Sequence, residues 1–136
     1  MMTTKAIHLS ASKGFILLSA ISLAYVAVMA IINPQAVMDL VGVKLPNNDS
    51  ISSIRGIYGG VGITLVVMLC YLAFFQTTNG LTFLTIFWGS YAFSRIVTQV
   101  VEGPLGDFGT TWLFIESCFC LIGVLLLIFG KKLNSK

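Results

Sequence analysis

The feature that most constrains the fold is a set of four apolar segments that follow one another along almost the whole chain, at 14–32, 51–75, 81–101 and 111–130. Each has about 20 residues, which at a helical rise of roughly 1.5 Å per residue spans a hydrocarbon core of about 30 Å. The segments are too long for single strands and lack the alternation of membrane-barrel strands. They predict four transmembrane helices within a single membrane domain, 1–136.

The composition supports this interpretation. Hydrophobic residues make up 57% of the chain and charged residues 10%, whereas soluble domains carry about 25% charged residues. A signal peptide is the alternative for the first segment, but 14–32 is longer than the usual apolar region of roughly 7 to 15 residues. We therefore expect an all-α integral membrane protein, an antiparallel four-transmembrane-helix bundle in direct contact with the lipid bilayer.

Basic residues predict the orientation of this bundle. Only Lys44 lies in the two loops on one side, 33–50 and 102–110, whereas five lysines lie on the side that holds both termini: Lys5, Lys13, Lys131, Lys132 and Lys136. By the positive-inside rule, both termini and the uncharged loop 76–80 are cytoplasmic. The net charge of +3 therefore reflects topology, and we expect no nucleic-acid partner.

The first outer loop contains signals for a short helix. Asn33 and Pro34 form a typical helix start and Gly42 a plausible stop. We predict an interfacial helix here, whose apolar residues lie on lipid or fold over the mouth of the bundle. Asp49 or Ser50 is expected to cap the second transmembrane helix.

Three ionisable residues from three different predicted helices reach a similar depth. Arg55 lies about 6 Å, Arg95 about 9 Å and Glu116 about 7 to 8 Å from the outer surface, by the rise per residue. At 100° per residue, Arg95 belongs to a polar stripe with Tyr91 and Gln99. Charges within spans normally face a bundle interior, so we expect Glu116 to serve as the counter-charge of Arg55.

These residues define a predicted ligand site near the outer leaflet: Arg55, Tyr58, Tyr91, Arg95, Gln99 and Glu116. Its character depends on Glu102. If Glu102 pairs with the arginines, the cluster is neutral and acts as a structural ion network. If Glu102 points into water, a net positive pocket remains, suited to a carboxylate, a phosphate or a polarised carbonyl.

Small residues in the second segment predict close helix packing, at Gly56, Gly59, Gly60 and Gly62. Gly56 and Gly60 form a GxxxG pattern, which lets two helix backbones approach one another. The pattern does not distinguish packing within the chain from packing against another chain. A homo-oligomer or another membrane-protein partner is therefore an open alternative.

Signals for redox, metal or cofactor chemistry are weak. Cys118 and Cys120 are two positions apart on a helix and point about 200° away from each other, so they cannot easily bridge. The single histidine, His8, falls in the N-terminal tail, away from the carboxylates. With no phosphate loop, zinc spacing or Ser/His/Asp set, we expect no metal, no cofactor and no catalytic residues.

Several motifs resemble a bacterial family of small four-helix membrane proteins of unknown function. They are "NP" at 33–34, "RGIYGG" at 55–60, Arg95 in "SRIV" and Glu116 in "FIES". The resemblance covers almost the full chain, and a more distant similarity links it to DoxX-like membrane proteins. It implies an antiparallel four-helix bundle in the bacterial inner membrane, but it implies no settled activity.

Three classes of function are compatible with these observations. The first is a protein that binds or transports a small anionic or amphipathic molecule at the charged cluster. The second is a non-catalytic structural or assembly protein that packs against other membrane proteins. The third and least favoured is an enzyme that acts on a lipid or quinone, because an arginine beside Glu116 opposes its use as a base.

Overall fold

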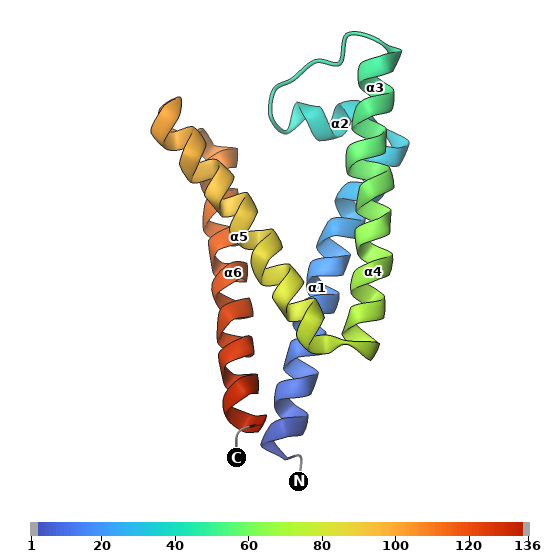
Figure 1. The fold of residues 1–136 in the computed structure, drawn as a ribbon. Helices are drawn as coiled ribbons and strands as arrows, with labels where there is room; N and C mark the ends of the chain where they lie inside the picture. Colours follow the sequence, from blue (N-terminus) through green and yellow to red (C-terminus); the bar gives the residue numbers. More distant parts are fainter. Residues whose placement is uncertain (1–2, 135–136) are drawn as a thin grey trace.

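The computed structural model describes residues 3–134, and every regular element within that range is helical (Figure 1). In chain order the elements are α1 (Thr4–Ile32), α2 (Pro34–Asp39), α3 (Asn48–Ile54), the π-helix η1 (Arg55–Gly60), α4 (Val61–Phe75), α5 (Thr77–Val101) and α6 (Asp107–Asn134). Because α3, η1 and α4 follow one another without a break, they form one continuous helical rod. The segment has four long helical rods and one short connecting helix.

Three of the four rods are long and apolar enough to cross a membrane: Thr4–Ile32, Asn48–Phe75 and Asp107–Leu133. The remaining rod, α5, has 25 residues but carries more polar side chains, including Ser94, Arg95 and Gln99. Large apolar side chains are exposed along all four rods, among them Ile21, Phe75, Phe93 and Phe114. A membrane supplies the apolar surroundings that these side chains lack within the chain.

The helices extend beyond the apolar segments from which they were predicted. α1 begins at Thr4, where the side chain of Thr3 accepts a hydrogen bond from Ala6 N. His8 therefore lies within a helix, and its expected place in a tail is wrong. α6 has Asp107 in its first turn and Lys131 in its last turn, the charges that complement the dipole at each end.

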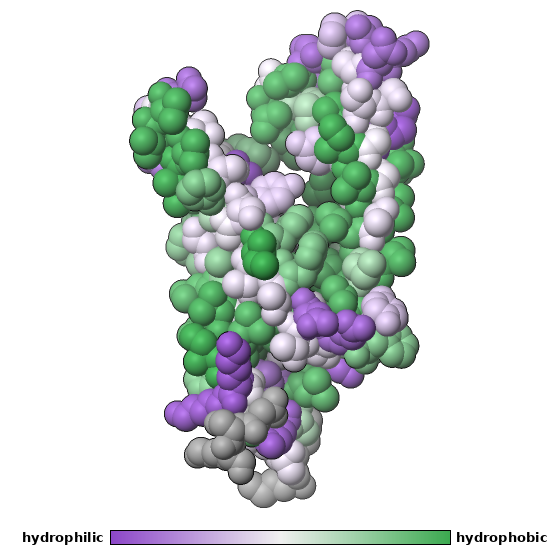
Figure 2. All heavy atoms as spheres, viewed as in Figure 1, coloured by the Kyte–Doolittle hydropathy of each residue, from purple (hydrophilic) through white to green (hydrophobic). Residues whose placement is uncertain are grey.

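The rods are arranged as two pairs. α1 packs along α4 and η1, and α5 packs along α6. Figure 1 shows the two pairs meeting near the end that holds both termini and separating toward the other end, where α2 and α3 lie. In Figure 2 the surface at that open end is hollowed into a notch, between the tips of α5 and α6 and the segment around α2.

The main core lies where the two pairs meet. Ile16 of α1, Leu69 of α4 and Leu84 of α5 are all fully buried there. Trp88 is 5% exposed and its indole Nε1 donates a hydrogen bond to Ser19 Oγ at 3.2 Å. This bond ties α5 to α1 through a buried polar contact, and it fixes how the two pairs meet below the notch.

The segment between α1 and α3 folds back onto the protein. The side chain of Asn33 accepts from Ala36 N, and Pro34 is the first helical residue, as the sequence predicts. α2 ends at Asp39, three residues before Gly42, which adopts a left-handed turn with φ +70°. Val37 and Met38 are buried against Ala30, so this part of α2 folds over the helices instead of facing lipid.

The cap of α3 differs from the prediction. Asn47, not Asp49 or Ser50, is the N-cap, and its side chain accepts from Ser50 N at 2.9 Å. Ser50 Oγ in turn accepts from Asn47 N. This reciprocal capping box satisfies two helix-terminal N–H groups at once, which explains why the helix starts before Asp49.

Candidate functional site

A buried ion pair joins α5 to α6 near the open end of the molecule. Arg95 Nε donates to Glu116 Oε2 at 2.7 Å, and Arg95 Nη2 donates to Glu116 Oε1 at 3.0 Å. The side chain of Glu116 is 2% exposed and that of Arg95 is 21% exposed. This is a bidentate guanidinium–carboxylate contact, the strongest geometry for such a pair. The prediction that these two residues reach the same level is confirmed.

Some N–H groups of Arg95 form no hydrogen bond with the described part of the chain. A guanidinium has five N–H groups in a rigid fork, and Glu116 engages two of them. No acceptor for the other three lies within residues 3–134. The Phe108 ring lies 5.8 Å from the guanidinium carbon, which adds a cation–π contact on one face. Arg95 is thus fixed in position by Glu116 and still has N–H groups that can donate to a further acceptor.

Two tyrosines from opposite helix pairs lie in the neighbourhood of this ion pair. Tyr91, one turn before Arg95 on α5, is close enough to Arg95, to Glu116 and to Tyr58 of η1 to be affected by their charges. Tyr58 packs against the small cluster formed by Ala30, Val37 and Met38. The two hydroxyl-bearing residues therefore come from opposite helix pairs, and they bring η1 into the surroundings of the ion pair.

Arg55 has a different role from the predicted one. Its Nε donates to the carbonyl oxygen of Ile31 at 3.0 Å, one residue before α1 ends at Ile32. The last carbonyls of a helix have no partner within the helix, and a cation there also complements the dipole. Arg55 therefore caps α1, whereas the expected pairing with Glu116 is replaced by that of Glu116 with Arg95.

The charge balance of the region follows from these contacts. Arg95 and Glu116 form a salt bridge, whereas Arg55 has a backbone acceptor and no carboxylate partner within residues 3–134. Glu102 is exposed at the C-terminal cap of α5, and Gln99 is exposed one turn earlier. Glu102 thus does not neutralise the buried arginine, whose counter-charge is Glu116. Arg55 keeps its positive charge at the end of α1, apart from this pair.

The glycines of this region divide into two sets. Gly59 and Gly62 are buried, and a Cβ at either would approach α1, at 2.6 Å from Ile31 Cδ1 and at 2.8 Å from Ala27 Cβ. Gly56 and Gly60 are exposed and face open space. Hence only half of the predicted packing set serves packing within the chain, and the GxxxG pair faces outward.

The π-helix is the feature of this region that sequence reasoning missed. It coincides with the "RGIYGG" stretch from Arg55 to Gly60. A π-helical turn accommodates an extra residue and is often found at functional sites. The available signal was the density of glycine beside an arginine, but periodicity at 100° per residue cannot represent such a turn. Its effect is to change the angular relation between α3 and α4.

The described part of the chain contains no disulfide and no cluster of metal-ligating side chains. Cys70, Cys118 and Cys120 are free thiols. No group of three or more metal-ligating side chains occurs within residues 3–134.

Together the all-helical fold, the apolar rods and the buried ion pair define a small helical membrane protein. The family comparison is consistent with this class: the model of a domain of unknown function, DUF4345, matches residues 11–127. The chain belongs to this family. No match was found among curated proteins or among solved structures.

Proposed function

We propose that the protein binds a small amphipathic molecule with an anionic or polarised oxygen at the notch between the two helix pairs. The observation that carries the proposal is the state of Arg95, which is mostly buried, fixed by Glu116, and has three N–H groups without acceptors. Arginine presents such donors in a fork that matches a carboxylate or phosphate. Tyr58 and Tyr91 add hydroxyl groups from the two sides.

The membrane arrangement that goes with this function is a four-span bundle in which α5 is the fourth span. Its Arg95 is neutralised by Glu116, and this pairing lowers the cost of placing the charge in a span. We further propose that both termini face the cytoplasm of a bacterium, that α2 lies at the outer interface of the inner membrane, and that the family is distantly related to DoxX-like proteins. The notch then opens toward the outer leaflet.

The test is native mass spectrometry of the protein released from lipid nanodiscs. Arg95→Leu alone would leave a buried unpaired carboxylate, so the double variant R95M/E116L removes both charges and keeps the volume. We expect a discrete adduct on the parent protein that is lost from the double variant and reduced by Tyr91→Phe. Tyr25→Phe, at an exposed tyrosine of α1, is the matched control and should keep the adduct. An adduct retained by a folded R95M/E116L protein would refute the proposal.

A second candidate function, assembly with another membrane protein or a second copy of the chain, is favoured by a different observation. Ser52, Gly56, Gly60 and Thr64 are all exposed at spacings of four, and open space surrounds Gly56 and Gly60. Small residues at this spacing allow close contact of transmembrane helices. Gly60→Leu should then disrupt a complex without affecting a bound small molecule. A parent protein that is monomeric in nanodiscs and captures no partner would contradict it.

A further inference from the structure

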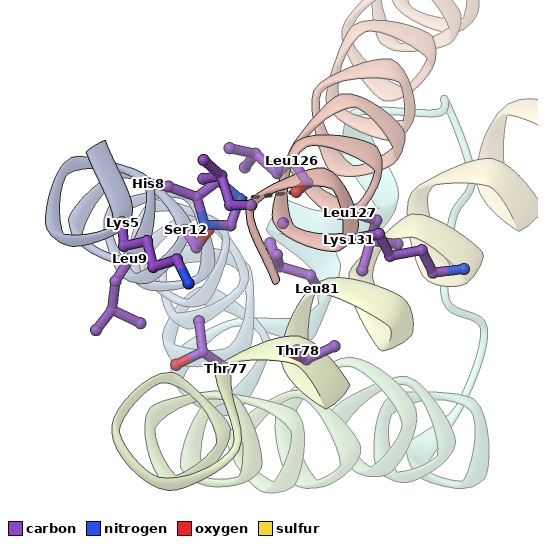
Figure 3. A pocket seen from close by; sticks show the side chains of 12 residues that line it. Lys5, His8, Leu9, Ser12, Thr77, Thr78, Leu81, Leu126, Leu127 and Lys131 are labelled. Carbon is purple, nitrogen blue, oxygen red and sulfur yellow. Dashed lines mark hydrogen bonds between the residues drawn. The ribbon is translucent and has the colours of Figure 1, made fainter. Parts of the chain in front are cut away.

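A cavity with several polar side chains in its wall lies at the opposite end of the molecule from the ion pair. It has a volume of about 240 Å³, and α1, the start of α5 and the end of α6 form its walls. Figure 3 shows its polar side chains, which are Lys5, His8 and Ser12 from α1, Thr77 and Thr78 from α5, and Lys131 from α6. Lys5, His8 and Ser12 are three and four residues apart, so they share one helix face.

Ser12 is the most informative residue of this cavity. It is 0% exposed, and its hydroxyl oxygen has no hydrogen-bond partner among the described residues. Other hydroxyls in these helices donate to the carbonyl four residues earlier, as Ser22 does to Leu18 and Thr85 does to Leu81. Buried polar groups are normally bonded. The Ser12 hydroxyl is therefore a buried polar group in the lining of the cavity, without a partner in residues 3–134, and a ligand that displaces the neighbouring side chains would supply one.

His8 is held in a defined position beside Ser12. Its Nε2 donates to the carbonyl oxygen of Leu126 at 2.8 Å, as the dashed line in Figure 3 marks. Gly130 makes room for the ring, because a Cβ there would lie 3.0 Å from His8 Cε1. With Nε2 engaged by the carbonyl, the other ring nitrogen, Nδ1, remains without a partner in the region 3–134.

The described side chains that line the cavity include positive charges and no carboxylate. Within residues 3–134, neither Lys5 nor Lys131 forms an ion pair. All five acidic side chains of the chain lie elsewhere: Asp39, Asp49, Glu102, Asp107 and Glu116. In Figure 3 the Lys5 side chain extends from α1 toward the start of α5, while the Lys131 side chain points away from Lys5 and His8. Both chains are long enough to turn toward a bound anion.

We propose that this cavity binds a phosphate group. Ammonium groups and a hydroxyl on separate walls match the several acceptor oxygens of a phosphate better than the two of a carboxylate. The remaining wall is apolar, with Leu9, Leu81 and Leu126 among its residues, and accommodates the carbon atoms next to an ester. The phosphate belongs either to the head group of an anionic phospholipid or to a free phosphate compound, and the experiment separates these sources.

The experiment uses the full chain in phosphatidylcholine nanodiscs. The probes are short-chain phosphatidic acid and inorganic phosphate, and binding is followed by calorimetry. Ser12→Ala removes the free hydroxyl without changing the packing, and the double variant K5Q/K131Q removes the charges. We expect each to weaken binding by about tenfold or more, because a bond to a charged group is lost. Ser22→Ala and Lys44→Gln are the matched controls and should bind as the parent does.

The two probes distinguish the sources of the phosphate. Binding of phosphatidic acid that inorganic phosphate does not displace indicates a lipid head group. Displacement by inorganic phosphate indicates a free phosphate compound. The proposal would be overturned if neither phosphatidic acid nor inorganic phosphate binds, or if a folded Ser12→Ala protein binds with unchanged affinity. Since Ser12→Ala removes only a buried hydroxyl without a partner, it should fold even if K5Q/K131Q does not.

Discussion

The two helix pairs place an arginine at the same end of the molecule and accommodate it in opposite ways. In the α1–α4 pair, Arg55 is exposed and bonds a backbone carbonyl of Ile31. In the α5–α6 pair, Arg95 is mostly buried and bonds the carboxylate of Glu116. Both pairs pack closely through glycines, since a Cβ at Gly59 or Gly62 would meet α1 and a Cβ at Gly123 of α6 would meet Thr85 of α5. Only the α5–α6 pair adds a pair of opposite charges to this contact. The comparison teaches that a charge in an apolar segment can serve helix termination as well as helix association.

The sharpest way to break this contrast is Glu116→Ala. It leaves the Arg95 charge buried without a partner, and such a loss costs about 3–5 kcal/mol. We expect a large drop in thermal stability in detergent, measured by circular dichroism. The double variant R95M/E116L should recover most of the stability, because neither charge is then left alone. Equal stability of Glu116→Ala and the parent would show that the pair contributes nothing to the α5–α6 contact.

The small-residue contact of the other pair is tested by Gly62→Ala. The new Cβ would lie 2.8 Å from Ala27 Cβ, which is attached directly to the α1 backbone and cannot rotate away. Overpacking of this kind costs about 1–3 kcal/mol, so the melting temperature should fall. Gly56→Ala, on the same rod but facing open space, is the control. A parent-like melting temperature for Gly62→Ala would mean that α1 and α4 are not this close.

A smaller effect is expected for Arg55→Met. This change keeps much of the side-chain volume but removes the hydrogen bond to the Ile31 carbonyl, at a cost of about 1 kcal/mol. Hydrogen exchange should increase near the end of α1, where the cap is lost. Exchange that rises instead around Glu116 would indicate that Arg55 interacts with the carboxylate, as the sequence first suggests.

The smallest change in stability is expected for Gly60→Ala, and this change should stabilise the protein instead of destabilising it. The position faces open space and its backbone is right-handed helical, with φ −62°. Alanine therefore costs nothing sterically and reduces the freedom of the unfolded chain, which stabilises by about 0.4–1 kcal/mol. The readout is the midpoint of thermal unfolding in monomeric detergent conditions. A lower midpoint would show that Gly60 is in contact with another helix.

Much of this architecture is predictable because it depends on properties that can be counted along the sequence, such as segment length, helix-start residues and the rise per residue. Apolar length predicts the rods, and Asn33–Pro34 predicts the start of α2. The rise per residue places Arg95 and Glu116 at a common depth. What spacing cannot supply is the choice of neighbours. The sequence predicts similar depths and inward faces for both Arg55 and Arg95, and the pairing of α5 with α6 decides which arginine contacts Glu116.

The cavity at the other end was missed for a related reason. The positive-inside rule accounts for the lysines near the two termini, but it does not predict that two of them line a cavity. The sequence places His8 before the first helix, so it does not predict that Lys5, His8 and Ser12 share one helix face. Because α1 starts at Thr4, Lys5, His8 and Ser12 lie on one face of this helix and form one wall of the cavity.

The π-helix has a consequence for how the length of this chain can change. Between Arg55 and Gly60 the backbone holds more residues per turn than an α-helix. Deleting one residue there would let the segment relax into regular α-helix, with the rotation of α4 about its axis largely preserved. A deletion after Gly62 in the α-helical part of α4 would instead rotate the following residues by about 100°, and would turn Leu69 and Ala73 away from the core. Natural one-residue gaps among relatives should therefore fall inside 55–60, and rarely in the turns that follow.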